Sequence, residues 1–178
     1  MSCKLTSNIT KESCAYAVAG IKAVYLFNYD PANTYTMGTD KEIETIALAN
    51  AAKAYSIDFI DNTASFSDEL AQNGNGGKYR THTVNFTLSE YNYTLLNQGD
   101  ALSLGKFTAV VVDKNNRSII LGRNNGLSAT AFNYASGAAD ADANGWTVTL
   151  AGTELEIGRL LKDESVITSV VDSTVVTP

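Results

Sequence analysis

The side chains that most often carry catalysis are scarce in this 178-residue chain, which has one histidine and two cysteines. A serine or cysteine nucleophile needs an adjacent general base, and that base would have to be His82, beside which the sequence places no nucleophile. A zinc centre needs three or four nitrogen or sulfur ligands, more than these residues supply unless carboxylates substitute. We therefore interpret His82 as a partly buried histidine at the start of a strand. We assign no catalytic residue, expect no cofactor and predict that the protein is not an enzyme.

One acidic segment has the spacing of a cation-binding loop. Asp140, Asp142 and Asn144, followed by a glycine, match the first half of an EF-hand calcium loop. The twelfth loop position should supply a bidentate glutamate, but it is Ala151, and Glu154 comes three residues too late. We therefore favour a hairpin turn and assign no metal. Asp140, Asp142 and Asn144 are the only candidate cation ligands.

The charge of the chain is unevenly distributed. There are 13 Lys and Arg against 19 Asp and Glu, which gives a net charge of −6. Residues 1–139 hold 11 basic and 12 acidic side chains, whereas residues 140–178 hold 2 and 7. This balance argues against wrapping nucleic acid, because phosphate binding needs Lys and Arg, but it is compatible with a surface along which DNA slides. It also predicts an acidic surface on the last hairpin and tail.

Two further features concern the compartment. No apolar run approaches the roughly 20 residues of a membrane span, so we expect a chain made in the cytosol with no membrane partner. In a reducing compartment, two cysteines such as Cys3 and Cys14 are more often free thiols than a disulfide.

Short apolar runs separated by Gly, Asn and Asp are typical of an antiparallel all-β domain. One helix is expected at about residues 89–104, with Ser89 as its N-cap and Gly105 as its stop, covering an open face or edge of the sheets. A helical turn is expected near residues 47–54. The expected strands lie at residues 20–28, 42–47, 54–60, 63–70, 79–88, 107–113, 118–122, 127–134 and 146–151.

The fold class expected from these elements is mainly β, an antiparallel β-sandwich or barrel with one flanking helix. With no repeat or long linker, residues 1–178 form a single domain. An N-terminal arm of about residues 1–19 and a C-terminal extension of about residues 158–178 flank it.

Several segments taken together resemble structural tail proteins of tailed phages that infect Bacteroidetes, crAss-like phages included. Each motif is short, and the resemblance lies in their order and spacing over about residues 1–160. Where that family has Asp-x-Asn-Gly after the central strand, this chain has Asp-Lys-Asn-Asn at residues 113–116. The motifs are the two cysteines leading into Gly20–Leu26, Ala64–Glu69 with the glycine-rich loop and Tyr79–Val84, Val112–Asn116, Leu121–Leu127, Ser136–Asp140 and Asn144–Trp146.

The resemblance implies a tail-tube-like fold, with two packed antiparallel sheets and a flanking helix. It also implies a virion structural protein that forms a homo-oligomeric ring in the tail or neck around the DNA channel. Its partners would be copies of itself and other tail, portal or hub proteins, with genomic DNA only as passing cargo.

Ring contacts are expected at loops and termini, because long loops are often functional. The loop at residues 29–41 carries Tyr29, Tyr35 and Met37, which we take as candidate subunit contacts together with the two terminal arms. Ordinary surface loops and frayed termini are the equally weighted alternative.

A second function class stays open from the residues alone. Nine tyrosines and one tryptophan, with Trp146 beside the turn at residues 140–145, are compatible with a β-sandwich module that binds host glycans.

Overall fold

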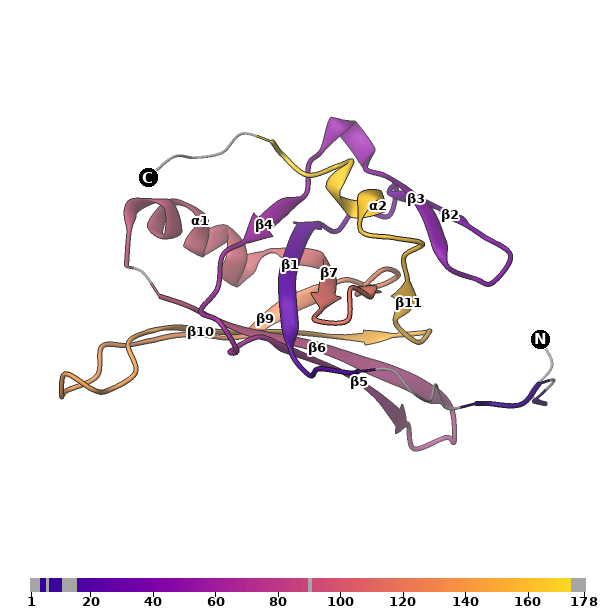
Figure 1. The fold of residues 1–178 in the computed structure, drawn as a ribbon, viewed down its shortest axis with the longest axis horizontal. Coiled ribbons are helices and arrows are strands. Elements are labelled where there is room, and N and C mark those ends of the chain that lie inside the picture. The colour runs from indigo at the N-terminus through magenta and orange to yellow at the C-terminus, as the bar shows by residue number, and fades with distance from the viewer. Residues whose placement is uncertain (1–3, 6, 11–15, 90, 174–178) are drawn as a thin grey trace.

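The computed structural model describes residues 4–5, 7–10, 16–89 and 91–173. It is mainly β, as expected (Figure 1). The elements are β1 (Ile21–Asn28), β2 (Thr34–Met37), β3 (Ile43–Ala47), the 3₁₀ turn η1 (Ala49–Ala51), β4 (Tyr55–Ile57), β5 (Ser65–Gln72), β6 (Lys78–Leu88), α1 (Tyr93–Leu104), β7 (Lys106–Asp113), β8 (Ser118–Leu121), β9 (Leu127–Ala135), β10 (Gly145–Glu154), β11 (Arg159–Leu160) and the single turn α2 (Ser165–Thr168).

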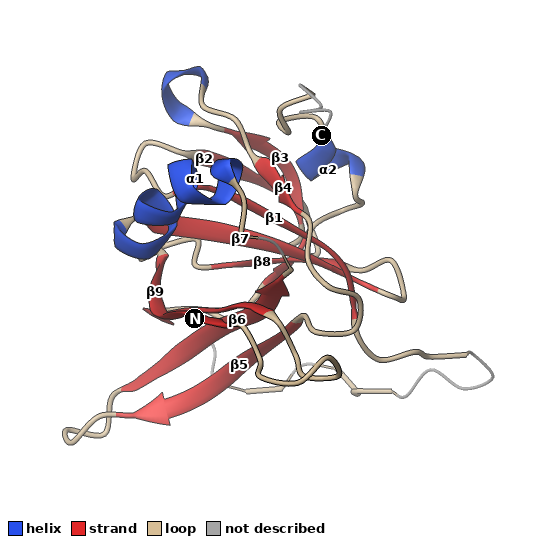
Figure 2. Cartoon of the chain, turned by 90° about the vertical axis from the view of Figure 1, so that its left-hand side faces the viewer, coloured by secondary structure: helices blue, strands red, loops and turns tan. Residues whose placement is uncertain are grey.

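Nine strands form one antiparallel sheet that bends into two layers. The order is β11-β8-β7-β9-β10-β6-β5, and β1 joins β7 and carries β4. The bend lies where β7 meets β9, because only Lys106 and Phe107 pair across it. β9, β10, β6 and β5 form the lower layer, and β1, β4, β7 and β8 lie above it (Figures 1 and 2). The sandwich expectation is confirmed, and the sheet is not closed into a barrel.

The main core fills the space between the two layers. On β6 and β10 every second side chain points inward, so that Val84, Phe86, Val148 and Leu150 are all buried. They pack against β1 and β7, the latter buried along nearly its whole length. The strand expected at residues 107–113 is therefore confirmed, and it lies in the middle of the upper layer.

A second core covers the opposite face of the upper layer. Phe27, Val110 and Ile120 point away from the lower layer and would be exposed on a bare sheet. The β2–β3 hairpin and the α2 turn bury them, which places a strand within the expected loop at residues 29–41. The C-terminal segment through residue 173 likewise packs onto the sheet, since an apolar sheet face must be covered by another element.

Helix α1 begins later than the sequence predicts. The side chain of Asn92 accepts a hydrogen bond from the amide of Leu95 at 2.8 Å and caps the helix, so Ser89 is not the cap. Gly105 ends the helix as expected. A side chain would not fit at this position, because a Cβ would lie 2.5 Å from the carbonyl oxygen of Ala101. The helix packs on β9, with Gly99 against Phe132. Among the described residues, neither helix has the length and apolar character needed to cross a membrane.

Candidate subunit-contact surfaces

His82 is a structural residue in the geometry of this fold. It is 2% exposed, and its Nδ1 accepts a hydrogen bond from the amide of Gly122 at 3.2 Å. Its Nε2 lies 3.3 Å from Oδ1 of Asp68, the residue opposite it on β5. A general base needs a free nitrogen facing a nucleophile, and here one nitrogen is occupied by the backbone and the other faces a carboxylate. The histidine lies in mid-strand and is more deeply buried than the sequence predicts.

Asp68 connects three parts of the chain. Its carboxylate accepts hydrogen bonds from Nε of Arg80 and from the amide of Gly158, and it faces His82. Burial alone would raise its pKa, but the hydrogen bonds from Arg80 and Gly158 and the charges of His82 and Arg80 outweigh burial and lower the pKa. Sequence reasoning missed this partner, although the register of the β5–β6 hairpin, read back from its glycine-rich turn, would have found it.

The acidic block at residues 140–178 does not form one free acidic face. Glu154 is 1% exposed and accepts hydrogen bonds from the amides of Asn124 and Asn125. Glu156 pairs with Arg123 and Arg159, and these bonds lower its pKa against the opposing effect of burial. Glu164 and Asp163 likewise bind partners within the chain. Glu154 and Glu156 are therefore used inside the fold, whereas Asp140, Asp142, Asp163 and Asp172 are exposed. The acidic surface expected from the sequence stays a prediction for these four residues.

The three candidate contact residues lie in different environments. Tyr29 is half-buried and donates its hydroxyl to the carbonyl of Asn124 at 2.5 Å. Tyr35 is half-buried under the guanidinium of Arg123, and burial raises the pKa of its phenol. Met37 is 38% exposed on the β2–β3 hairpin. Only Met37 presents much of its side chain to a neighbour, and all three stay predictions as subunit contacts.

Two of the three candidate cation ligands in the turn at residues 140–145 direct side-chain oxygens at protein donors, and the third, Asp140, is exposed. Asp142 accepts hydrogen bonds from the amides of Ala138 and Ala139, which lower its pKa. Asn144 accepts one from the hydroxyl of Tyr134 at 2.9 Å. Within the described part of the chain no three acidic, histidine or cysteine side chains group as a metal site would need. The segment joins β9 to β10, which confirms the predicted hairpin.

The outer face of the lower layer is open and almost uncharged. Successive residues of a strand point to opposite faces, so the residues between the buried ones form this outer face, and the register shows which of them are neighbours. No described element covers it (Figure 1). Its cross-strand rows are Ser65, Asn85, Thr149 and Ala131; Ser67, Thr83, Ala151 and Ser128; Thr87, Thr147 and Asn133; and Glu69, Thr81 and Thr153. Glu69 is the single charged residue in these rows.

Both outer strands of this four-stranded layer have an edge available for pairing. β5 is the last strand of the sheet, and in the described part of the chain nothing pairs with its outer edge. Beyond Ser128, β9 pairs with β10 on one side only. The β5–β6 hairpin also extends beyond the other strands (Figure 2). An exposed edge is a template for another chain.

Aromatic rings gather at the end of the molecule that carries α1. The ring of Trp146 stacks on Phe132 with centroids 4.5 Å apart, and Tyr91 and Tyr134 lie at 5.3 and 5.2 Å. Tyr91 is 59% exposed. The indole Nε1 of Trp146 is buried and has no hydrogen-bond partner in the described part of the chain. The sequence placed Trp146 beside the turn, but it did not show that four rings from three segments meet there.

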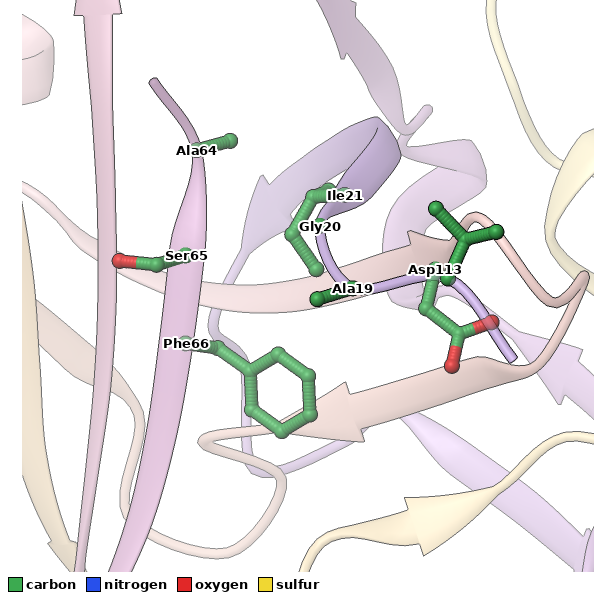
Figure 3. Close-up of a pocket in the computed structure, with 8 residues that line it drawn as sticks. Ala19, Gly20, Ile21, Ala64, Ser65, Phe66 and Asp113 are labelled. Carbon is green, nitrogen blue, oxygen red and sulfur yellow. The ribbon is translucent and has the colours of Figure 1, made fainter. Parts of the chain in front are cut away.

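A small pocket of about 200 Å³ marks the root of the N-terminal arm. It lies between residues 18–21, the first residues of β5 and the end of β7 (Figure 3). Asp113 is its one charged lining residue, and its carboxylate is already bound by the amides of Asn115 and Arg117 and by the Arg117 side chain. The pocket therefore offers no free charged group for a ligand.

Cys3 and Cys14 lie outside the described residues. No protein-family model matches this chain, no curated protein matches it, and no solved structure does either.

Proposed function

We propose that this protein is a structural subunit of a phage virion, assembling with copies of itself into a ring in the tail or neck that surrounds the DNA channel. The observation that carries the proposal is the open outer face of β5, β6, β10 and β9, which is uncovered, nearly uncharged and bounded by available edges. A surface that guides DNA without holding it should lack Lys and Arg, because those residues bind phosphates. The rows of Thr, Ser, Asn and Ala meet that condition.

The strand count supports head-to-tail assembly through these edges. The layer contains four antiparallel strands, so β5 and β9 run in opposite directions. The β9 edge of a second copy placed beside β5 would therefore continue the antiparallel pattern. Such a contact joins two different surfaces, and it closes into a ring when the rotation between copies allows it. Portal, hub or other tail proteins would then meet the ring at its ends.

The proposal is tested by mass photometry and electron microscopy of the purified full-length chain. Rings of identical subunits are expected as concentration rises. Ser67→Lys places a cation at the β5 edge, where it should discourage pairing, whereas Thr147→Lys places the same side chain on the same face of the central strand β10. Loss of rings in the first variant alone is the expected result. A wild-type chain that stays monomeric at high concentration, with no such ring in virions, contradicts the proposal.

The alternative function, a module that binds host glycans, would use the aromatic cluster at Trp146. Sugar binding needs an open aromatic face, but Phe132 stacks on one side of Trp146 and Tyr91 lies against it as well. Tyr91 and Tyr134 present the more open rings. The geometry therefore favours assembly, and a glycan array without binding would remove the alternative.

A further inference from the structure

An apolar groove lies between α1 and the inner face of β9 and β10. Its volume is about 240 Å³, and its walls include Leu95, Leu96, Phe132 and Trp146. The one charged lining residue is Asp100. The indole Nε1 of Trp146 is buried and has no hydrogen-bond partner among the described residues.

The size of the groove indicates what kind of occupant it fits. Sites for drug-sized small molecules run from about 300 to 1,000 Å³. This groove is smaller and is shaped by aliphatic and aromatic side chains, so it suits one or two apolar side chains of a peptide segment.

The N-terminal arm of the same chain has the matching chemistry. Leu5 and Ile9 are 84% and 87% exposed, so the body of their own subunit does not bury them. The root of the arm is held firmly, because the Asn115 side chain makes two hydrogen bonds to the backbone of Val18 and the amide of Lys114 donates to Gly20. Leu5 and Ile9 are therefore available to a partner outside their own subunit.

The geometry indicates that the partner is a second copy. The arm leaves the body below β1, and its described residues before residue 11 lie at the opposite end of the long axis from α1 (Figure 1). The 14 residues from Leu5 to Val18 span at most about 45 Å when extended. In a head-to-tail row, the arm of one copy would therefore point toward the α1 end of the next.

The charges of the two surfaces are complementary. Residues 1–19 contain Lys4 and Lys11 against Glu12. The segments beside the groove, residues 89–105 and 136–145, contain four acidic residues and no basic one. Opposite net charges favour encounter and disfavour docking of an acidic segment.

We propose that the N-terminal arm of one copy docks in the α1 groove of the next, with Leu5 and Ile9 as its anchoring side chains. The inference rests on the proposed self-assembly and specifies one of its contacts. The contact joins two different surfaces, so it extends a row in one direction.

Trp146 is the only tryptophan, so its fluorescence reports groove occupancy directly. The emission of the full-length chain should shift to shorter wavelength as the copies assemble. Deletion of residues 1–17 should abolish that shift, and a peptide of residues 1–19 added to the deleted chain should restore it. Leu5→Asp with Ile9→Asp should raise the concentration needed for assembly at least about tenfold, because two buried aliphatic contacts are lost.

A matched pair of variants tests the groove side. Leu96 lines the groove, whereas Leu104 is 87% exposed on the same helix and does not line it. Leu96→Asp should weaken assembly as the arm variant does, and Leu104→Asp should leave it unchanged. Both chains should retain the wild-type circular dichroism spectrum.

The outcomes separate this inference from the proposed function. Rings that form equally well without residues 1–17 would overturn arm docking and leave ring assembly standing. A peptide that binds the deleted chain, although the full-length chain never forms rings, would support arm docking and remove the ring. A Trp146 response to host glycans but not to the peptide would overturn the inference in favour of a sugar site.

Discussion

At the scale of single residues, His82 and Asp68 show how one buried contact links distant parts of the chain. Asp68 on β5 binds Arg80 and faces His82 on β6, and it also accepts the amide of Gly158. His82 in turn accepts the amide of Gly122 after β8. These bonds tie the lower layer to the upper one, so their loss should appear as lost stability.

The first prediction concerns the buried histidine. His82→Ala leaves a cavity and an unsatisfied Gly122 amide, so the free energy of unfolding should fall by about 2–3 kcal/mol. Thr81→Ala, on the opposite face of the same strand, should cost less than about 1 kcal/mol. Urea denaturation measures both. A His82→Ala chain with wild-type stability that no longer assembles would instead assign the histidine a direct functional role.

The second prediction concerns pH. The pKa of Asp68 is lowered in the folded state below its ordinary value of 3.8, so its ionisation stabilises the fold above that pH. The contribution is lost as pH falls through the lowered pKa. Asp68→Asn should therefore be less stable than wild type at pH 7, and the difference should shrink below about pH 3.8. The difference in the free energy of unfolding between wild type and Thr81→Ala should not change with pH. A difference for Asp68→Asn that is equally constant would contradict the link between Asp68 ionisation and stability.

At the scale of elements, local sequence patterns predict the hairpins well and predict the first residue of helix α1 less well. The sequence predicts strands at residues 63–70 and 79–88 on either side of a glycine-rich loop, and the structure pairs them as the β5–β6 hairpin. At the β7–β8 turn, Asn116 adopts φ of +60°, as expected for an asparagine in the position that usually favours glycine. The predicted start of α1 is wrong because Ser89 and Asn92 are both good N-cap residues, and residue type alone does not select between them.

The helix start yields the third prediction. Asn92→Ala should lower the free energy of unfolding by about 1 kcal/mol, because the Leu95 amide loses its acceptor. Ser89→Ala should change it by less than about 0.5 kcal/mol. Equal effects of the two substitutions, measured by thermal unfolding, would contradict this assignment of the cap.

At the scale of the whole molecule, charged side chains are distributed unevenly, and the open face of the lower layer has almost none. The open face of the lower layer carries Glu69 as its single charge in rows of Thr, Ser, Asn and Ala. In the acidic C-terminal block, Glu154 and Glu156 form hydrogen bonds and ion pairs inside the fold, whereas four aspartates stay exposed.

The fourth prediction follows from this electrostatic pattern. The wild-type chain should not bind double-stranded DNA measurably at physiological salt, because the open face has no Lys or Arg. Thr83→Lys with Thr149→Lys should create binding that weakens steeply as salt rises. Two lysines introduced at exposed positions outside the open face, by Met37→Lys and Leu104→Lys, should give weaker binding. Fluorescence anisotropy with labelled DNA distinguishes these results, and tight wild-type binding would contradict a passive channel surface.

The sequence by itself determined the mainly β class, most strand positions, the hairpins and the shortage of catalytic residues. These properties depend on residue type and on neighbours a few positions away, as in the alternation of Val84 and Phe86 or the turn at Asn116. Only the tertiary structure decided the Asp68–His82 contact, the cover that β2, β3 and α2 form over the second core, and the groove at Trp146. Each of these brings together residues far apart in the chain. Their meeting depends on how the sheet bends between β7 and β9, and no local pattern encodes that bend.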